Sequence, residues 1–242
     1  NEGLNFIKKL FQIDGVSIIG GMSLTTAFLG FIYSISYTTA AVTLFMLALM
    51  PFLASLIAFI FLKEKISKQN FVSMVIAFIG TLVMIYASAF SGSFFGLIMG
   101  FVSSLGFAAF SVALRSKSDI KKFCILIYGG IFCALFSAML MIINNQDFYI
   151  PIKNVYLSMT HGTLVASGLI LFSIGSKQLL SGELTMLSLL EVVGGIFWAW
   201  LPILGINEVP SMNTIIGGAI ICVAIAMNSY RFDKKRLQNL TR

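Results

Sequence analysis

The residues of this sequence that could do chemistry are few and lie far apart. His161 is the single histidine, and the three cysteines, Cys124, Cys133 and Cys222, all lie within apolar stretches. A metal site needs clustered ligands, and a serine nucleophile needs a histidine with an acid beside it. A phosphate-binding G-x-x-x-x-G-K-[ST] loop is absent as well. We therefore expect no cofactor, no metal and no enzymatic activity.

Glu191 is the most informative residue, because it lies inside an apolar segment about 10 Å from its start at 1.5 Å per residue. A carboxylate at such a depth costs about 2.5–3.5 kcal/mol in a membrane helix and by default indicates a cavity or a pathway. It could bind a proton or an amine-bearing substrate. It could equally be a hydrogen-bonded structural group between helices, and both interpretations stay open.

Three more residues complete the set of candidate substrate-binding residues, which is Glu191, Trp198, His161 and Tyr33. His161 could relay protons, although a hydrogen-bonded packing role is the stronger expectation. Trp198 and Tyr33 could stack on a substrate, but aromatic rings near span ends are also typical interfacial anchors. Glu64 and Glu208 fall at span ends, where we expect them to cap the following helix or to pair with nearby cations.

The elements that must position these residues are membrane spans. Hydrophobic residues make up 58% of the chain and charged residues only 10%, against about 25% charged in a soluble domain. A hydrocarbon core needs roughly 20 apolar residues per helix. The fold class is therefore an all-α polytopic membrane protein, and eight transmembrane helices are predicted near residues 16–34, 41–62, 71–87, 94–114, 123–143, 155–175, 184–204 and 212–230.

The distribution of cations predicts the orientation of these spans. When the chain crosses the membrane once per span from an inside N-terminus, all of the 16 lysines and arginines except Lys153 fall inside. The net charge of +7 thus reflects the positive-inside rule and not a nucleic-acid partner. We expect a multi-pass protein of the cell (inner) membrane with both termini of this chain cytoplasmic.

Two stretches of the chain resemble each other. The first stretch is residues 51–67 with the span after them, and the second is residues 191–211 with the span that starts at 212. In both, an apolar helix ends in a glutamate, a serine follows three residues later, and a new apolar helix begins. Glu64 falls inside and Glu208 outside, so the two copies are inverted. Inverted repeats are a common plan of secondary transporters, with the site near the midplane.

The sequence resembles the EamA-type permeases of the drug/metabolite transporter superfamily, on "LKEKIS" at residues 62–67, "GLILFSIGSKQL" at 168–179 and "SLLEVVGGIFWAWLPILGINEVPSMNTIIGGAII" at 188–221. The family has ten helices in two inverted five-helix repeats. The resemblance implies a cytoplasmic segment at 1–15, the last three helices of the first repeat at 16–90, the second repeat at 91–231 and a basic tail at 232–242, with two helices upstream. "LKE" replaces the usual "LGE".

The function implied is secondary transport: export of a small metabolite, an amino acid or a related compound, by alternating access. The expected partners are a small-molecule substrate and membrane lipid, with a homodimer left open. An intramembrane lipid-modifying enzyme is one alternative, and it would need polar residues clustered at one depth. A channel is the other, and it would usually have charged rings in place of an inverted repeat.

Overall fold

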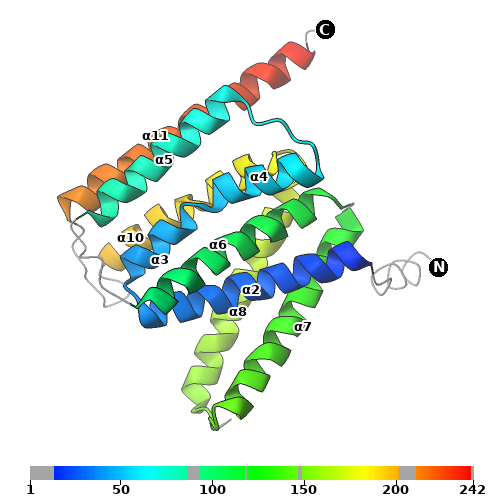
Figure 1. Ribbon diagram of the computed structural model, residues 1–242, viewed down its shortest axis with the longest axis vertical. Coiled ribbons are helices and arrows are strands. Elements are labelled where there is room, and N and C mark those ends of the chain that lie inside the picture. Colours follow the sequence, from blue (N-terminus) through cyan, green and yellow to red (C-terminus); the bar gives the residue numbers. More distant parts are fainter. Residues whose placement is uncertain (1–13, 87–92, 118, 147–148, 202–210, 241–242) are drawn as a thin grey trace.

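The computed structural model describes residues 14–86, 93–117, 119–146, 149–201 and 211–240, and every regular element within these ranges is a helix (Figure 1). The helices are α2 (Gly15–Tyr37), α3 (Ala40–Leu47), α4 (Met50–Phe61), α5 (Lys68–Ile85), α6 (Phe94–Arg115), α7 (Asp119–Ile143), α8 (Ile152–Gly175), α9 (Ser181–Ser188), α10 (Leu190–Trp200) and α11 (Met212–Leu240).

Seven segments of the described chain are long and apolar enough to cross a membrane, with α3 and α4 together forming the span Val42–Phe61. They coincide with seven of the eight predicted spans. The remaining predicted span, 184–204, corresponds to α9 and α10, and its last residues lie outside the described part of the chain. The all-helical class is confirmed, whereas the count of eight stays a prediction.

Two of the spans are broken into shorter helices. The span around Pro51 stops at Leu47 and resumes at Met50, so that the proline occupies the first turn of α4, where its missing N–H costs little. The second break separates α9 from α10 at Leu189, which has helical dihedral angles but ends the regular hydrogen-bond ladder. In both cases a helix of 8 residues precedes the break.

The helices pack in two groups (Figure 1). In the first group α2 lies along α6 and crosses α7, and these three helices enclose a core that contains Leu24, Phe110 and Ile125. In the second group α5 lies along α11, and their core includes Ala77 and Ile221. The broken span α3–α4 contacts both α6 and α5, and α9 packs on α4. The broken spans therefore join the two groups.

Glycines allow the backbones of α2 and α6 to approach closely. A Cβ on Gly106 would lie 2.7 Å from the carbonyl oxygen of Ser23 and 2.8 Å from the amide nitrogen of Ala27. The Ser103 hydroxyl also donates to the Ala27 carbonyl across 2.8 Å. Small residues at the interface are the usual way for membrane helices to gain packing and interhelical hydrogen bonds. The contact thus needs glycine because the atoms it meets are backbone atoms that cannot move aside.

One end of the helix bundle is more tightly joined than the other. The connections α4–α5, α6–α7 and α8–α9 meet at what we call the basic end, which carries Lys63, Lys65, Lys68, Arg115, Lys117, Lys121 and Lys177. The buried side chains described in α7 lie between residues 122 and 129, in the half of the helix nearer this end. In α8 only Ser173 is buried, again near the basic end. Toward their other ends, α7 and α8 therefore separate from the bundle.

We predict that Gly106→Ala lowers the stability of the protein by about 1–3 kcal/mol, because the added methyl group must push α2 away from α6. Gly168→Ala is the matched control, since a Cβ at that position of α8 meets nothing within 4 Å. Unfolding of each variant by a denaturing detergent, followed by circular dichroism, measures the difference. Equal midpoints for the two variants would contradict the proposed close contact.

Candidate functional site

Glu191 lies in the first turn of α10, directly after the break at Leu189. It is ten residues from the start of α9 at Ser181, which places it ~15 Å along a pair of helices that together are ~30 Å long. The residue is thus close to halfway along the span, deeper than the apolar pattern of the sequence indicated. Its side chain is exposed on the protein surface and makes no hydrogen bond or ion pair within the described residues.

His161 lies on α8 at a comparable depth, nine residues or ~14 Å from the start of the helix at Ile152. Its side chain is exposed, and among the described residues it has no hydrogen-bonded partner. Nearby hydroxyl groups are satisfied within the helix: Thr160, Thr163 and Ser167 each donate to a carbonyl one turn back. Unlike these three hydroxyl groups, the imidazole of His161 keeps its hydrogen-bonding capacity for another partner.

Tyr33 does not lie with these two residues. It belongs to an aromatic cluster near the end of α2, where its ring stacks on Tyr37 and meets Phe95 edge-on at centroid distances of 6.3 and 6.1 Å. The anchoring interpretation fits these contacts better than the substrate-stacking one, because the ring already has aromatic partners. The side chain of Trp198 lies outside the described part of the structure.

A cavity of about 420 Å³ lies between α2, α7 and α8. Its walls are almost entirely apolar, from Leu24 and Phe28 on α2 to Val165 on α8, and glycines on the facing helices, Gly130 and Gly162, leave room between them. Gly162 is next to His161 in the chain. The cavity has the size of a small-molecule site and would suit the apolar portion of a ligand.

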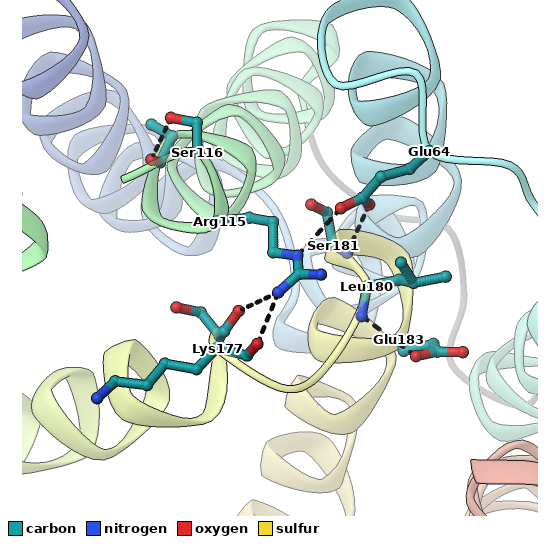
Figure 2. A network of polar contacts seen from close by, with 9 residues as sticks. Glu64, Arg115, Ser116, Lys177, Leu180, Ser181 and Glu183 are labelled. Carbon is teal, nitrogen blue, oxygen red and sulfur yellow. Dashed lines mark hydrogen bonds and ion pairs between the residues drawn. The ribbon is translucent and has the colours of Figure 1, made fainter. Parts of the chain in front are cut away.

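At the basic end, a network of polar contacts surrounds Glu64 (Figure 2). One carboxylate oxygen of Glu64 accepts from Arg115 Nε at 3.1 Å, and the other accepts from the backbone N–H of Ser181 at 3.1 Å. Arg115 Nη1 in turn donates to the carbonyl oxygens of Ser176 and Lys177 at 3.2 and 2.7 Å. The end of α4, the end of α6 and the connection α8–α9 are therefore held by one ion pair and its hydrogen bonds.

A second carboxylate extends this network to α5. Glu183 accepts from Asn70 Nδ2 at 2.7 Å and from the Leu180 N–H at 3.2 Å, while Ser67 caps α5. We call this set the basic-end latch: Glu64, Asn70, Arg115, Ser181 and Glu183 with the carbonyl groups of Ser176 and Lys177. The cavity beneath it measures only about 10 Å³, enough for at most one water molecule. Little space therefore remains between the latch residues themselves.

The latch confirms one of the two roles expected for Glu64 and corrects the other. Glu64 pairs with a cation, as expected, and its side chain is only 14% exposed. It does not cap the following helix, because Ser67 does so; it caps α9, whose sequence is more than a hundred residues away. From the sequence, Arg115 is only one of the cations that predict the orientation. A single sequence does not indicate that it pairs with Glu64. Glu208 lies outside the described residues.

A second ion-pair cluster lies at the same end. Asp14 caps α2 by accepting from the Ser17 N–H at 3.1 Å, and it also pairs with Lys117 at 2.9 Å and Lys121 at 3.6 Å. Burial by itself would raise the pKa of Asp14, but the hydrogen bonds from Lys117 and Ser17 outweigh it and hold that pKa well below its ordinary value. This cluster joins α2 to the α6–α7 connection and does not involve α8 or α9.

The backbone turn that presents Glu64 is strained at Lys63. Lys63 has φ of 57°, and the Glu64 N–H returns to the carbonyl oxygen of Ala58 in the last turn of α4 at 3.2 Å. Glycine is the residue that adopts this left-handed conformation without a steric cost. The "LGE" that is usual in the resembling family has glycine at this position, so the turn explains that preference physically.

We predict that Lys63→Gly raises the free energy of unfolding by about 0.5–1 kcal/mol, since it relieves the left-handed strain. Asn145 also has a positive φ, of 50°, at the end of α7, but asparagine tolerates this conformation better than lysine. Asn145→Gly should therefore gain less in the same detergent-unfolding measurement. A larger gain at Asn145 than at Lys63 would show that φ strain is not what distinguishes the two turns.

Comparison with known proteins supplies the family. Residues 7–86 match the EamA-like transporter family. No curated protein matches the chain. Among solved structures, one titled "Crystal structure of protein" superposes with a TM-score of 0.70 at 19% sequence identity and covers 94% of this chain and 80% of its own; this likeness establishes the fold. The chain is a multi-pass membrane protein, and its residues 7–86 match the model of the EamA-like transporter family, part of the drug/metabolite transporter superfamily.

Proposed function

We propose that this protein is a secondary transporter that exports a small metabolite, an amino acid or a related compound, across the cytoplasmic membrane by alternating access. The family membership supports transport of a small substrate. The observation that carries the mechanism is the difference between the two ends of the bundle. The latch leaves little space between α4, α5 and α9 at the basic end, while α7 and α8 diverge toward the other end. A carrier that is closed on one side and open on the other has this form.

The two broken spans support an inverted repeat of the kind that alternating access uses. Each starts with a helix of 8 residues, and Pro51 and Glu191 occupy the same position after their breaks. The span α3–α4 starts at the far end of the bundle and α9–α10 starts at the basic end, so the two run in opposite directions. Discontinuous helices in corresponding positions of two inverted halves are typical of secondary transporters, whose site lies near the breaks.

Glu191 and His161 are the proposed substrate-binding residues with the best support. Both lie at mid-depth of their spans, both side chains are exposed, and neither has a partner within the described residues. Glu191 also lies in the first turn of α10, directly after the break at Leu189. A carboxyl group at mid-depth would suit a proton or a substrate with an ammonium group. Trp198 and Tyr33 stay in the proposal as secondary contacts.

Uptake of radiolabelled amino acids by proteoliposomes, measured as counterflow against each unlabelled compound, tests the proposal. A carrier gives flux that saturates with substrate concentration. Flux that rises linearly without saturation would favour the channel. Turnover of the vesicle lipid without solute movement would favour the lipid-modifying enzyme.

For the orientation we propose that the basic end faces the cytoplasm, in keeping with its cations. A cysteine at Asn145, at the other end of α7, should then react with an impermeant maleimide added to intact cells. A cysteine at Gln69, in the first turn of α5, should react only after the cells are permeabilised. The opposite pattern would reverse the proposed orientation and with it the side on which the latch lies.

We predict that Glu191→Gln abolishes flux, or its pH dependence, while the protein folds and reaches the membrane. Glutamine keeps the size and hydrogen bonding of glutamate but can neither bind a proton nor attract an ammonium group. The matched control is Glu191→Leu: if the residue has only a structural role, leucine should lower the thermal stability and glutamine should leave flux intact. Wild-type flux with an unchanged pH profile in the glutamine variant would exclude the functional role.

A further inference from the structure

The basic-end latch connects parts of the chain that an opening motion would have to separate. Glu64 follows α4, Arg115 ends α6, and Ser181 begins α9. Since α4 and α9 belong to the two oppositely directed broken spans, the Glu64–Ser181 hydrogen bond crosses directly from one to the other. The Arg115 guanidinium adds the end of α8 through the carbonyl groups of Ser176 and Lys177.

These contacts are concentrated on one carboxylate. Each oxygen of Glu64 accepts one hydrogen bond, and each of the two donors comes from a different element. Hydrogen bonds of this charge-assisted kind are about twice as strong as neutral ones. Loss of the carboxylate would leave both the guanidinium and the N-terminus of α9 short of an acceptor. Among the latch residues, the bonds that would remain are those of Arg115 to the Ser176 and Lys177 carbonyl groups and that of Asn70 to Glu183.

Next to the latch, α9 packs closely against α4. Gly182 follows Ser181 at the start of α9, and a Cβ there would overlap the Ser55 hydroxyl oxygen of α4. The Ser181 side chain is completely buried, yet its hydroxyl has no hydrogen-bond partner among the described residues. A buried hydroxyl without a partner is unfavourable, so the Ser181 hydroxyl does not favour the closed arrangement. The bonds of Glu64 and the close packing of α9 on α4 favour it.

We propose that the basic-end latch is the gate of this end of the transporter, and that breaking the bonds of Glu64 to Arg115 and Ser181 lets α9 separate from α4. The inference rests on the proposed transport cycle, in which the end that is closed here must open in turn. Asp14 and its two lysines lie at the same end but outside the gate, because they join α2 to the α6–α7 connection and the first turn of α7.

The reactivity of a buried thiol tests this gate without any substrate. In a protein whose three native cysteines are replaced by alanine, Ser181→Cys puts a thiol behind the latch and Ser73→Cys puts one on α5; both serines are 0% exposed and have unpaired hydroxyls. The rate of modification by N-ethylmaleimide is followed by mass spectrometry in lipid nanodiscs, where both sides are accessible.

Addition of Glu64→Gln should speed the modification of Ser181→Cys about tenfold or more, as expected for the loss of a hydrogen bond to a charged group. Ser73→Cys should keep its slow rate. The matched control, Asp14→Asn, breaks the other ion-pair cluster and should leave both rates unchanged.

Three outcomes would overturn the proposal: an unchanged rate at Ser181→Cys with Glu64→Gln, equal acceleration at Ser73→Cys, or equal acceleration by Asp14→Asn. The second would mean general loosening, and the third would mean that any ion pair at this end has the same effect. Because no flux is measured, failure here leaves the transport proposal in place. Failure of the flux assay, in turn, would not alter the labelling rates.

Discussion

The Glu64 carboxylate supplies the polar bonds at the point where the broken spans meet α6. Apolar contacts hold each group together, because α2 packs with α6 and α7, and α5 packs with α11. In a membrane, however, apolar contact between helices has little advantage over contact with lipid, so specificity has to come from close backbone packing and from polar bonds. Glu64 supplies two such bonds at the junction, and its side chain is only 14% exposed. It therefore behaves unlike an exposed surface ion pair, which contributes about 0–1 kcal/mol.

The two groups also differ in how they use small residues. On α5 and α11 the contact is reciprocal: a Cβ on Gly80 would meet the Gly217 carbonyl, and a Cβ on Gly217 would meet the Gly80 carbonyl. Such a mutual approach fixes the two helices rigidly against each other. On α8 the opposite holds, because an added Cβ at Gly162 or Gly168 meets nothing. In the proposed transport cycle, the closely packed α5–α11 pair would stay fixed and the loosely packed α8 would move.

Much of the fold could be predicted from the sequence, because membrane spans are set by local properties. Apolar length alone places seven spans correctly. The break before α4 has a local cause in the sequence, because Pro51 within an apolar run cannot continue the hydrogen-bond ladder. The break at Leu189 has no such signal: no proline or glycine adjoins it, and tertiary packing must determine it. Depth was misjudged for the same reason, since Glu191 is ten residues from the true helix start at Ser181. The basic-end latch could not be predicted. Its bonded residues lie far apart in the chain, 117 positions in the case of Glu64 and Ser181, and a single sequence does not indicate which distant residues are paired.

The candidate binding residue Glu191 and the latch lie on neighbouring parts of one broken span. Glu191 is attached to α9 through a single turn at Leu189, and the N–H at the start of α9 is bonded to Glu64. A helix of 8 residues is only ~12 Å long and transmits displacement nearly rigidly. A ligand that pulls on Glu191 therefore acts on the same short element that the latch holds. Coupling between the proposed site and the proposed gate would need a shared two-state element. Among the described helices, α9 meets this need, because it adjoins α10 and its first N–H is bonded to Glu64.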